Sequence, residues 1–220
     1  MKRILITGAN KGIGLATATA LLERYEDVSI LLGARDLARG RAALDRLCHQ
    51  HPGWTPRLDL LAIDVASRQS VSSARDMLVD KYGSDQAPLY GIVNNAGIGL
   101  GSDDMETILQ VNTLGVKRVC DAFVPLIESS GRVVNVSSAA APKFVSQCNL
   151  ERQSFFQDSS VEWAVLERLI DEVCRLQGDA QGFSALGLGN ANAYGFSKTC
   201  VSLYTLMLAR DNPHLCVNAC

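Results

Sequence analysis

The 220-residue sequence lacks features that mark several large classes of protein. No apolar run approaches the length of a membrane-spanning helix. The net charge of −2 gives no electrostatic reason to expect binding to nucleic acid or to an anionic membrane surface. Lys2 and Arg3 lead directly into an apolar run, so the N-terminus leaves no room for a secretion signal. We therefore expect neither a membrane nor a nucleic-acid partner.

The sequence also lacks paired cysteines and clustered histidines. Its seven cysteines are scattered, and none forms a Cys-x-x-Cys pair. An odd number of cysteines without a secretion signal predicts reduced thiols and a cytoplasmic location. His49, His51 and His214 show no ligand spacing with the cysteines. Chemistry based on a metal or on cysteine therefore has little support.

What the sequence does contain is an alternation of strand-like and helical patterns. We expect strands over 4–6, 28–32, 58–63, 89–93, 132–136 and 215–219, and helices over 13–22, 37–49, 70–82, 104–125, 161–176 and 193–210. This alternation predicts an α/β fold, a doubly wound parallel sheet with helices on both faces. The composition, 47% hydrophobic and 20% charged, predicts one globular domain over residues 1–220.

A glycine-rich turn connects the first strand to the first helix, with the spacing Gly8-x-x-x-Gly12-x-Gly14. Such a turn presents free backbone N–H groups and the positive end of a helix dipole to an anion. We expect Gly8 to permit the tight turn, Gly12 to let a pyrophosphate approach the backbone, and Gly14 to let helix and strand pack closely. A structural turn without a ligand is the alternative.

Polar residues also follow the other expected strands. In an open parallel sheet, ligands bind beyond the carboxyl ends of the strands. The residues at those ends are Arg35, Asp64, the segment 94–97 (Asn-Asn-Ala-Gly), and the pair Ser137 and Ser138. Together with the glycine turn, they predict a ligand site along one edge of the sheet.

Tyr194 and Lys198 supply a reactive pair on the helix expected over 193–210. Residues four apart share a helix face, so the Lys198 ammonium can lie near the Tyr194 phenol. A nearby positive charge favours the phenolate form of a tyrosine. Such a phenol can protonate a carbonyl oxygen as hydride arrives, or remove that proton in the reverse direction. Considered alone, the pair also fits a solvated helix face.

These motifs together resemble the short-chain dehydrogenase/reductase family. The matching positions, in the family's order, are Thr7-Gly8-x-x-x-Gly12-x-Gly14, Asn94-Asn95-Ala96-Gly97, Asn112, Ser138 and Tyr194-x-x-x-Lys198. The match spans nearly the whole chain.

The resemblance implies a role for each catalytic position. Tyr194 is the general acid/base, and Ser138 polarises the substrate oxygen, with Ser137 as the competing serine. Lys198 assists the tyrosine and holds the nicotinamide ribose, and Asn112 anchors a water that relays protons to Lys198.

Within the family, the sequence is most similar to the monomeric carbonyl reductases. Tyr194 follows Ser138 by 56 positions (194 − 138), far more than in ordinary members, so we expect an insertion at about 139–192. Its stretch 161–176 has helical periodicity and is expected to cover the face through which other members dimerise, whereas 178–192 reads as a loop. We therefore expect a monomer.

Charge near the second strand predicts the cofactor. NAD-preferring enzymes usually place a carboxylate there, but this sequence has Arg35, and Lys11 lies in the glycine turn. Two cations favour the 2′-phosphate of NADPH, and Asp36 is expected to cap the following helix. The full set of expected cofactor-binding residues is Gly8, Asn10, Lys11, Gly12, Ile13, Gly14, Arg35, Asp64, Val65, Asn94, Ala96, Gly97, Tyr194 and Lys198.

The sequence departs from the family after Cys220. The subgroup continues there with a Pro-Gly motif, a threonine, and a further strand and segment that cover the nicotinamide and substrate, so we expect a sheet lacking its last strand. The first hypothesis is NADPH-dependent reduction of a small carbonyl compound (ketone, aldehyde or quinone) to an alcohol. The alternative is a shortened form that binds nucleotide or a protein partner with little turnover.

Overall fold

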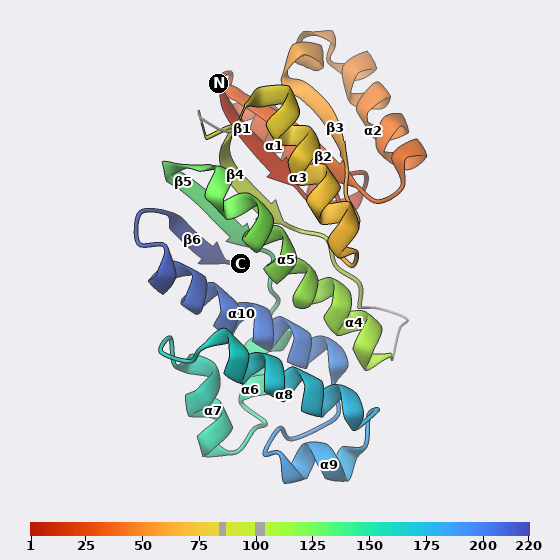
Figure 1. Cartoon of the computed structure of the whole chain (residues 1–220). Helices are drawn as coiled ribbons and strands as arrows, with labels where there is room; N and C mark the ends of the chain where they lie inside the picture. Colours follow the sequence, from red (N-terminus) through yellow and green to blue (C-terminus); the bar gives the residue numbers. More distant parts are fainter. Residues whose placement is uncertain (84–86, 100–103) are drawn as a thin grey trace. The chain divides into compact units, whose positions relative to one another are not determined.

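The computed structural model describes residues 1–83, 87–99 and 104–220 (Figure 1). In this part of the chain, six strands form one sheet in the order β3-β2-β1-β4-β5-β6. The strands are β1 Lys2–Ile6, β2 Val28–Ala34, β3 Leu58–Ala62, β4 Leu89–Asn94, β5 Ile127–Asn135 and β6 Cys216–Ala219. The pairs β1–β2, β1–β4 and β2–β3 are parallel. The predicted parallel α/β sheet is confirmed.

The strand order reverses beside β1, which lies between β2 and β4. Right-handed connections place α1 (Gly12–Arg24) and α2 (Leu37–Gln50) on one face of the sheet, and α3 (Arg68–Tyr82) on the other. Ligands of such sheets bind at the carboxyl end of the strands where the order reverses. The glycine turn after β1 and the segment after β4 therefore both occupy the expected ligand-binding edge.

Contacts within the chain divide it into two compact units. Unit 1 contains Met1–Ala96, Arg118–Val134 and His214–Cys216, and unit 2 contains Gly97–Lys117, Asn135–Pro213 and Val217–Cys220. We describe each unit by itself. The single domain expected from the sequence stays a prediction.

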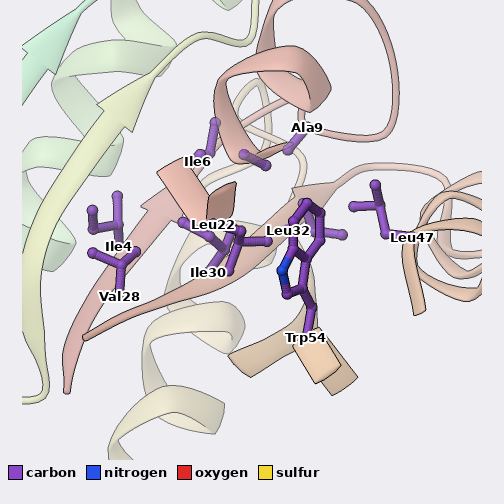
Figure 2. Close-up of a cluster of buried hydrophobic side chains, with 10 residues drawn as sticks. Ile4, Ile6, Ala9, Leu22, Val28, Ile30, Leu32, Leu47 and Trp54 are labelled. Atoms are coloured by element: carbon purple, nitrogen blue, oxygen red, sulfur yellow. The ribbon is translucent and has the colours of Figure 1, made fainter. Parts of the chain in front are cut away.

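The core of unit 1 forms between β1, β2, α1 and α2. All seven residues of β2 are buried, as expected for a central strand with both faces covered. The cluster consists of Ile4, Ile6, Ala9, Ala18, Leu22, Val28, Ile30, Leu32, Leu47 and Trp54 (Figure 2). Trp54 comes from a short 3-10 helix, Pro52–Arg57, and its ring stacks on His51 at 3.8 Å. This core fixes the strand ends from which the ligand edge is built.

Unit 2 is organised around the long helix α10 (Ala193–Asp211), of which twelve residues are buried. Helix α10 contacts α4 (Met105–Asn112), α6 (Ala140–Val145), α7 (Leu150–Gln157) and α8 (Trp163–Arg175) (Figure 1). Phe196 of α10 lies within 6.4 Å, between ring centroids, of Phe144, Phe156 and Phe183. Helix α10 thus has an apolar neighbour on several sides.

The insertion is more helical than the sequence predicted. Besides the expected helix, which is α8, it contains α6, α7 and α9 (Ala180–Ala185). The expectation of a loop over 178–192 was wrong at α9, because Phe183 is fully buried and anchors that turn against Phe196. Helix α8 buries Leu166, Leu169, Ile170 and Val173 and contacts α4 and α10, so the expected helix is confirmed, while its covering of a dimerisation face stays a prediction.

The helix expected over 104–125 is interrupted. It forms α4, which ends at Asn112, then α5 (Leu114–Phe123) and a 3-10 turn (Val124–Leu126). Within the described residues, no helix combines the length and hydropathy needed to cross a bilayer. All seven cysteines lie in the described ranges, and none is joined in a disulfide.

Candidate functional site

The glycine turn of unit 1 has the conformation that an anion site requires. Gly8 and Gly12 adopt φ of +66° and +57°, in the left-handed region that other residues avoid. Beyond its chain neighbours and its own helix backbone, no atom of the described residues lies within 4 Å of the position that a Gly12 Cβ would take. The backbone there leaves room for a ligand. A Cβ on Gly14 would collide with the Asn95 amide and lie 2.8 Å from the Gly8 carbonyl oxygen. The turn and helix α1 therefore pack closely at Gly14, as expected.

No side-chain cap and no acidic residue of the first turn occupies the first N–H groups of helix α1. Its N-cap, Lys11, makes no side-chain capping bond, and the first turn carries no acidic residue. Lys11 and Ile13 are exposed, and Asn10 is half-buried. Open N–H groups at a helix N-terminus, beside a glycine backbone that a ligand can approach, fit the pyrophosphate of a dinucleotide.

Thr7 ties the ends of β1 and β4 together. Its buried Oγ1 accepts hydrogen bonds of 3.0 Å from the backbone N–H groups of Asn95 and Ala96. The Asn95 side-chain amide donates to the carbonyl oxygens of Thr7 (2.9 Å) and Gly8 (3.2 Å). Hydrogen bonds from side chains at the ends of β1 and β4 thus hold these two segments together at the ligand-binding edge.

Exposed cations lie at and near the end of β2. Arg35 is exposed, and Asp36 caps α2 by accepting from the Arg39 N–H at 3.0 Å. The other Asp36 oxygen pairs with Arg39 Nε at 3.2 Å, so the capping carboxylate is neutralised locally. The expected capping role of Asp36 is confirmed. With Asp36 and Arg39 paired, Arg35 and Lys11 leave this part of unit 1 positively charged.

The remaining predicted cofactor-binding residues differ in their hydrogen-bond partners and in their exposure to solvent. Asp64 follows β3 and accepts from the Ala66 N–H at 3.0 Å, and the Val65 carbonyl accepts from Arg118 at 3.2 Å. The buried Asn94 amide donates to Cys120 Sγ at 3.3 Å, on α5. Ala96 lies against Gly8, with its Cα 3.0 Å from the position of a Gly8 Cβ. Gly97 is exposed and belongs to unit 2.

Unit 2 brings the predicted tyrosine and lysine together on α10. The Lys198 Nζ lies 5.7 Å from the centre of the Tyr194 ring and donates to the Val136 carbonyl oxygen at 2.7 Å. Lys198 is only 5% exposed, and this burial lowers the pKa of its ammonium. Tyr194 is half-buried. The predicted pair therefore shares one helix face, with a buried cation beside an accessible phenol.

The two serines after β5 have different hydrogen-bond partners. The Ser137 hydroxyl lies 2.8 Å from Ser202 Oγ and also donates to the Lys198 carbonyl oxygen at 3.2 Å. Ser138 Oγ accepts from the Ala140 N–H at 3.1 Å, at the start of α6. An oxygen that accepts one bond keeps its own hydrogen for another acceptor.

Asn112 is buried at the end of α4, where its amide makes three hydrogen bonds. Its Oδ1 accepts from the Ile98 N–H at 2.9 Å, and its Nδ2 donates to the Ile98 carbonyl at 2.8 Å. The same Nδ2 donates to Ser197 Oγ on α10 at 3.1 Å. Asn112 therefore holds the backbone of residue 98 and helix α10 in a fixed relation.

A cavity of about 850 Å³ lies in unit 2 between α6, α7, α10 and β6. Its lining includes Val145, Phe156 and Leu206, but none of Asn112, Ser138, Tyr194 and Lys198. We assign it no part in the reaction.

Sequence reasoning missed the structural parts played by several polar residues: Asn95, Arg39, Ser197 and the hydroxyl of Thr7. The available signals were the second asparagine of the 94–97 segment and the arginine three residues after the capping Asp36. Nothing in the sequence signals the bond between Asn112 and Ser197, because the two residues are far apart along the chain.

Comparison with known proteins gives consistent results. Residues 2–149 match the family described as short chain dehydrogenase. The chain is 35% identical over 213 residues to the mouse protein named carbonyl reductase (NADPH) 1, covering 94% of this chain and 73% of the relative. It is 33% identical over 230 residues to human carbonyl reductase (NADPH) 3, covering 98% of this chain and 79% of the relative.

Solved structures share the fold. Menthone neomenthol reductase from Mentha piperita matches with a TM-score of 0.85 and 26% identity, covering all of this chain and 89% of that one. Salutaridine reductase from Papaver somniferum matches with a TM-score of 0.83 and 22% identity, covering all of this chain and 85% of that one. From the family match and the identity to the curated relatives, the chain belongs to the short-chain dehydrogenase family of oxidoreductases.

Proposed function

We propose that this protein reduces small carbonyl compounds (ketones, aldehydes or quinones) to alcohols with NADPH. The observation that carries the proposal is the pairing on α10 of a half-buried phenol, Tyr194, with a buried ammonium, Lys198. A family match and relatives named as NADPH carbonyl reductases support the same chemistry. Unit 1 binds the adenosine part of the cofactor, and unit 2 carries the catalytic groups.

Tyr194 acts as the general acid. When bound, NADPH supplies a hydride to the carbonyl carbon, and the electron pair of the C=O π bond moves onto the oxygen. The Tyr194 hydroxyl gives its proton to that oxygen, so the product is a neutral alcohol and the tyrosine is left as phenolate. The Lys198 ammonium stabilises this negative charge, because an opposite charge nearby favours the ionised form.

Ser138 orients the substrate. Its Oγ already accepts a hydrogen bond from Ala140, which leaves its own hydrogen to donate to the carbonyl oxygen. The Ser137 hydroxyl is already engaged with Ser202 and with the Lys198 carbonyl. This difference favours Ser138 over Ser137. A hydrogen bond aimed at the oxygen where charge develops lowers the barrier.

The Lys198 ammonium has enough hydrogen-bond donors to bind a cofactor as well as the protein backbone. An ammonium has three donors, and the bond to the Val136 carbonyl uses one of them. The others can serve the nicotinamide ribose and the water that Asn112 is expected to anchor. Because Ile98 and Ser197 take both hydrogens of the Asn112 amide nitrogen, the water would be held by an oxygen of Asn112, either Oδ1, which accepts one bond, or the backbone carbonyl.

NADPH is preferred over NADH because the end of β2 carries cations. Arg35 and Lys11 are exposed, and the nearby carboxylate of Asp36 is capped and paired. A guanidinium can bind a phosphate with two parallel hydrogen bonds. The neutral 2′-hydroxyl of NADH cannot accept such a bidentate, charge-assisted contact. Asp64 and Val65 contact the adenine in this proposal.

The protein acts as a monomer on a small molecule. Helix α8 uses its apolar face on α4 and α10, within the same chain. Those two helices therefore have less apolar surface left for a second copy. Light scattering tests this part of the proposal, and a dimer at working concentration would contradict it.

The activity is tested with the purified chain, NADPH and a reactive quinone or dione, by the loss of NADPH absorbance. Turnover in the wild type, reduced by about a hundredfold or more in Tyr194→Phe, supports the proposal. If NADPH quenches the fluorescence of Trp54 or Trp163 without turnover, the chain is instead a nucleotide-binding protein with little catalysis.

A further inference from the structure

A chain of contacts in unit 2, with Asn112 and Ser197 buried at its centre, connects the backbone after β4 to helix α10. Its members are Ile98, Gly99, Asn112, Ser197 and Tyr194. Asn112 holds Ile98 through two hydrogen bonds and Ser197 through a third. The Ser197 hydroxyl in turn donates to the Tyr194 carbonyl at 2.8 Å. The first turn of α10, which carries Tyr194, and the segment containing Gly99 thus share one anchor.

Gly99 lies directly against the Cδ2 and Cε2 atoms of the Tyr194 ring. A Cβ at Gly99 would lie 2.5 Å from Tyr194 Cδ2 and 2.6 Å from Cε2, far inside van der Waals contact. The φ angle of Gly99 is outside the left-handed region, so φ itself does not require glycine there. The ring therefore occupies the space that a side chain at position 99 would need.

Ser197 is held from two sides and has no exposure to solvent. Its Oγ accepts from Asn112 and donates to Tyr194, and its carbonyl accepts from Thr113 Oγ1 at 3.0 Å. A fully buried, fully bonded hydroxyl has one orientation, because any rotation leaves a buried polar group unpaired. Ser197 thus fixes the distance between the first turn of α10 and Asn112.

We propose that Gly99 and Ser197 are positioning residues that set the orientation of the Tyr194 ring, with Asn112 as the link between them. The proposal rests on the proposed role of Tyr194 as general acid. A general acid must be held within hydrogen-bond reach of the oxygen it protonates, and small displacements reduce the rate steeply. Neither residue touches the reacting atoms in this proposal.

The orientation of the Tyr194 ring can be followed by fluorine NMR, which does not depend on enzyme activity. Protein labelled with 3-fluorotyrosine carries five fluorine signals, one for each tyrosine, and the Tyr194 signal is the one lost in Tyr194→Phe. We expect Gly99→Ala to move the Tyr194 signal strongly and Ser197→Ala to move or broaden it. The matched controls Gly53→Ala and Ser154→Ala should leave it in place. Gly53 has open space around it, and Ser154 makes only a bond to Leu150 on an exposed helix.

Steady-state kinetics provide the second readout. We expect Gly99→Ala and Ser197→Ala each to lower kcat by about tenfold or more with little change in KM, because the phenol is misplaced while binding is intact. Ser197→Cys, which keeps a weak donor, should fall between Ser197→Ala and the wild type. The double variant Gly99→Ala/Ser197→Ala should lose less than the product of the single losses, because both changes disturb one ring.

The outcomes separate this proposal from the proposed function. A Tyr194 fluorine signal that stays in place in folded Gly99→Ala, as judged by an unchanged melting temperature, overturns the positioning role. So do strictly multiplicative losses, since they mean that the two residues act independently. An inactive wild type counts against the proposed function alone, because the fluorine signal still reports where the ring lies.

Discussion

The cations proposed to recognise the cofactor in unit 1 and the lysine proposed for catalysis in unit 2 lie in opposite surroundings. In unit 1, Lys11, Arg35 and Arg39 are exposed to solvent beside the predicted 2′-phosphate position. In unit 2, Lys198 is only 5% exposed and reaches a backbone carbonyl. In the proposed function, the same kind of charge therefore serves recognition in one unit and chemistry in the other.

The difference shows how environment decides what a charge can do. An exposed cation keeps its hydration, so it adds selectivity at almost no cost to folding and is weakened by salt. A buried ammonium loses hydration, which lowers its pKa and opposes folding while it stays charged. We expect substitutions in unit 1 to change cofactor preference, and substitutions in unit 2 to change rate.

Lys198→Met should have the largest effect and should separate rate from stability. We expect turnover to fall by about a thousandfold, because the phenolate loses its partner. The free energy of unfolding at neutral pH should change little, because removing a buried charge offsets the lost hydrogen bond to the Val136 carbonyl. Turnover assays and urea denaturation of both proteins test these two statements together.

The pH dependence of that comparison has a definite sign. The folded-state pKa of Lys198 lies below its ordinary value of 10.5, so between the two values the unfolded chain binds more protons. The stability of the wild type should therefore rise relative to Lys198→Met as the pH increases toward 10.5. A relative stability that is flat or falls over this range would show that burial does not perturb the lysine.

Thr7→Val should have the next largest effect, because it removes hydrogen bonds that connect the end of β1 to the segment after β4. The substitution leaves the Ala96 N–H without its acceptor and removes one of the two acceptors of the Asn95 N–H, which also donates to the Val93 carbonyl at 3.0 Å. We expect a cost of about 2 kcal/mol in the free energy of unfolding. Thr19→Val is the matched control, since the Thr19 hydroxyl only donates to Leu15 within α1. Equal losses in chemical denaturation of the two variants would contradict the role assigned to Thr7.

Arg35→Gln should reduce the preference for NADPH over NADH by about tenfold, the value of one charge-assisted contact. Stability should stay within error of the wild type, because Arg35 is exposed. Fluorescence titrations with both nucleotides measure the ratio, and higher salt should shrink it. Arg46→Gln, on an exposed position of α2, is the control. If NADH binds as well as NADPH to the wild type, the charge argument fails.

Asp36→Asn should have the smallest effect. Asparagine keeps the cap of α2, so stability should hardly change. Because Arg39 already neutralises the carboxylate, we expect NADPH affinity to change by less than about threefold. A large gain in affinity would mean that Asp36 repels the 2′-phosphate despite its ion pair.

Features that depend on short stretches of sequence could be predicted. Gly8 and Gly12 have positive φ, a conformation that few other residues adopt, so their spacing predicts the turn directly. Tyr194 and Lys198 share a helix face because they are four residues apart. The capping role of Asp36 also follows from its place before an apolar-periodic segment.

Features that depend on contacts between distant residues could not be predicted. The interruption after Asn112 coincides with bonds from Asn112 and Thr113 to Ser197, which lies far along the chain. Helix α9 forms in a glycine-rich stretch because Phe183 finds a buried place beside Phe196. Adjacent residues at a strand end point in opposite directions, so the sequence could not tell that Asn94 turns inward while Asn95 meets the glycine turn.

The placement of α10 has a consequence for the order in which the chain folds. The buried cluster of unit 1 lies between Ile4 and Trp54, so its partners emerge early and close together during synthesis. Helix α4 instead packs against α10, and all of β5, α6, α7 and α8 is made between them. Contacts between segments so distant close slowly, because a long loop must first be ordered. Pulse-labelled hydrogen exchange should therefore show protection in β1 and β2 before protection in α4.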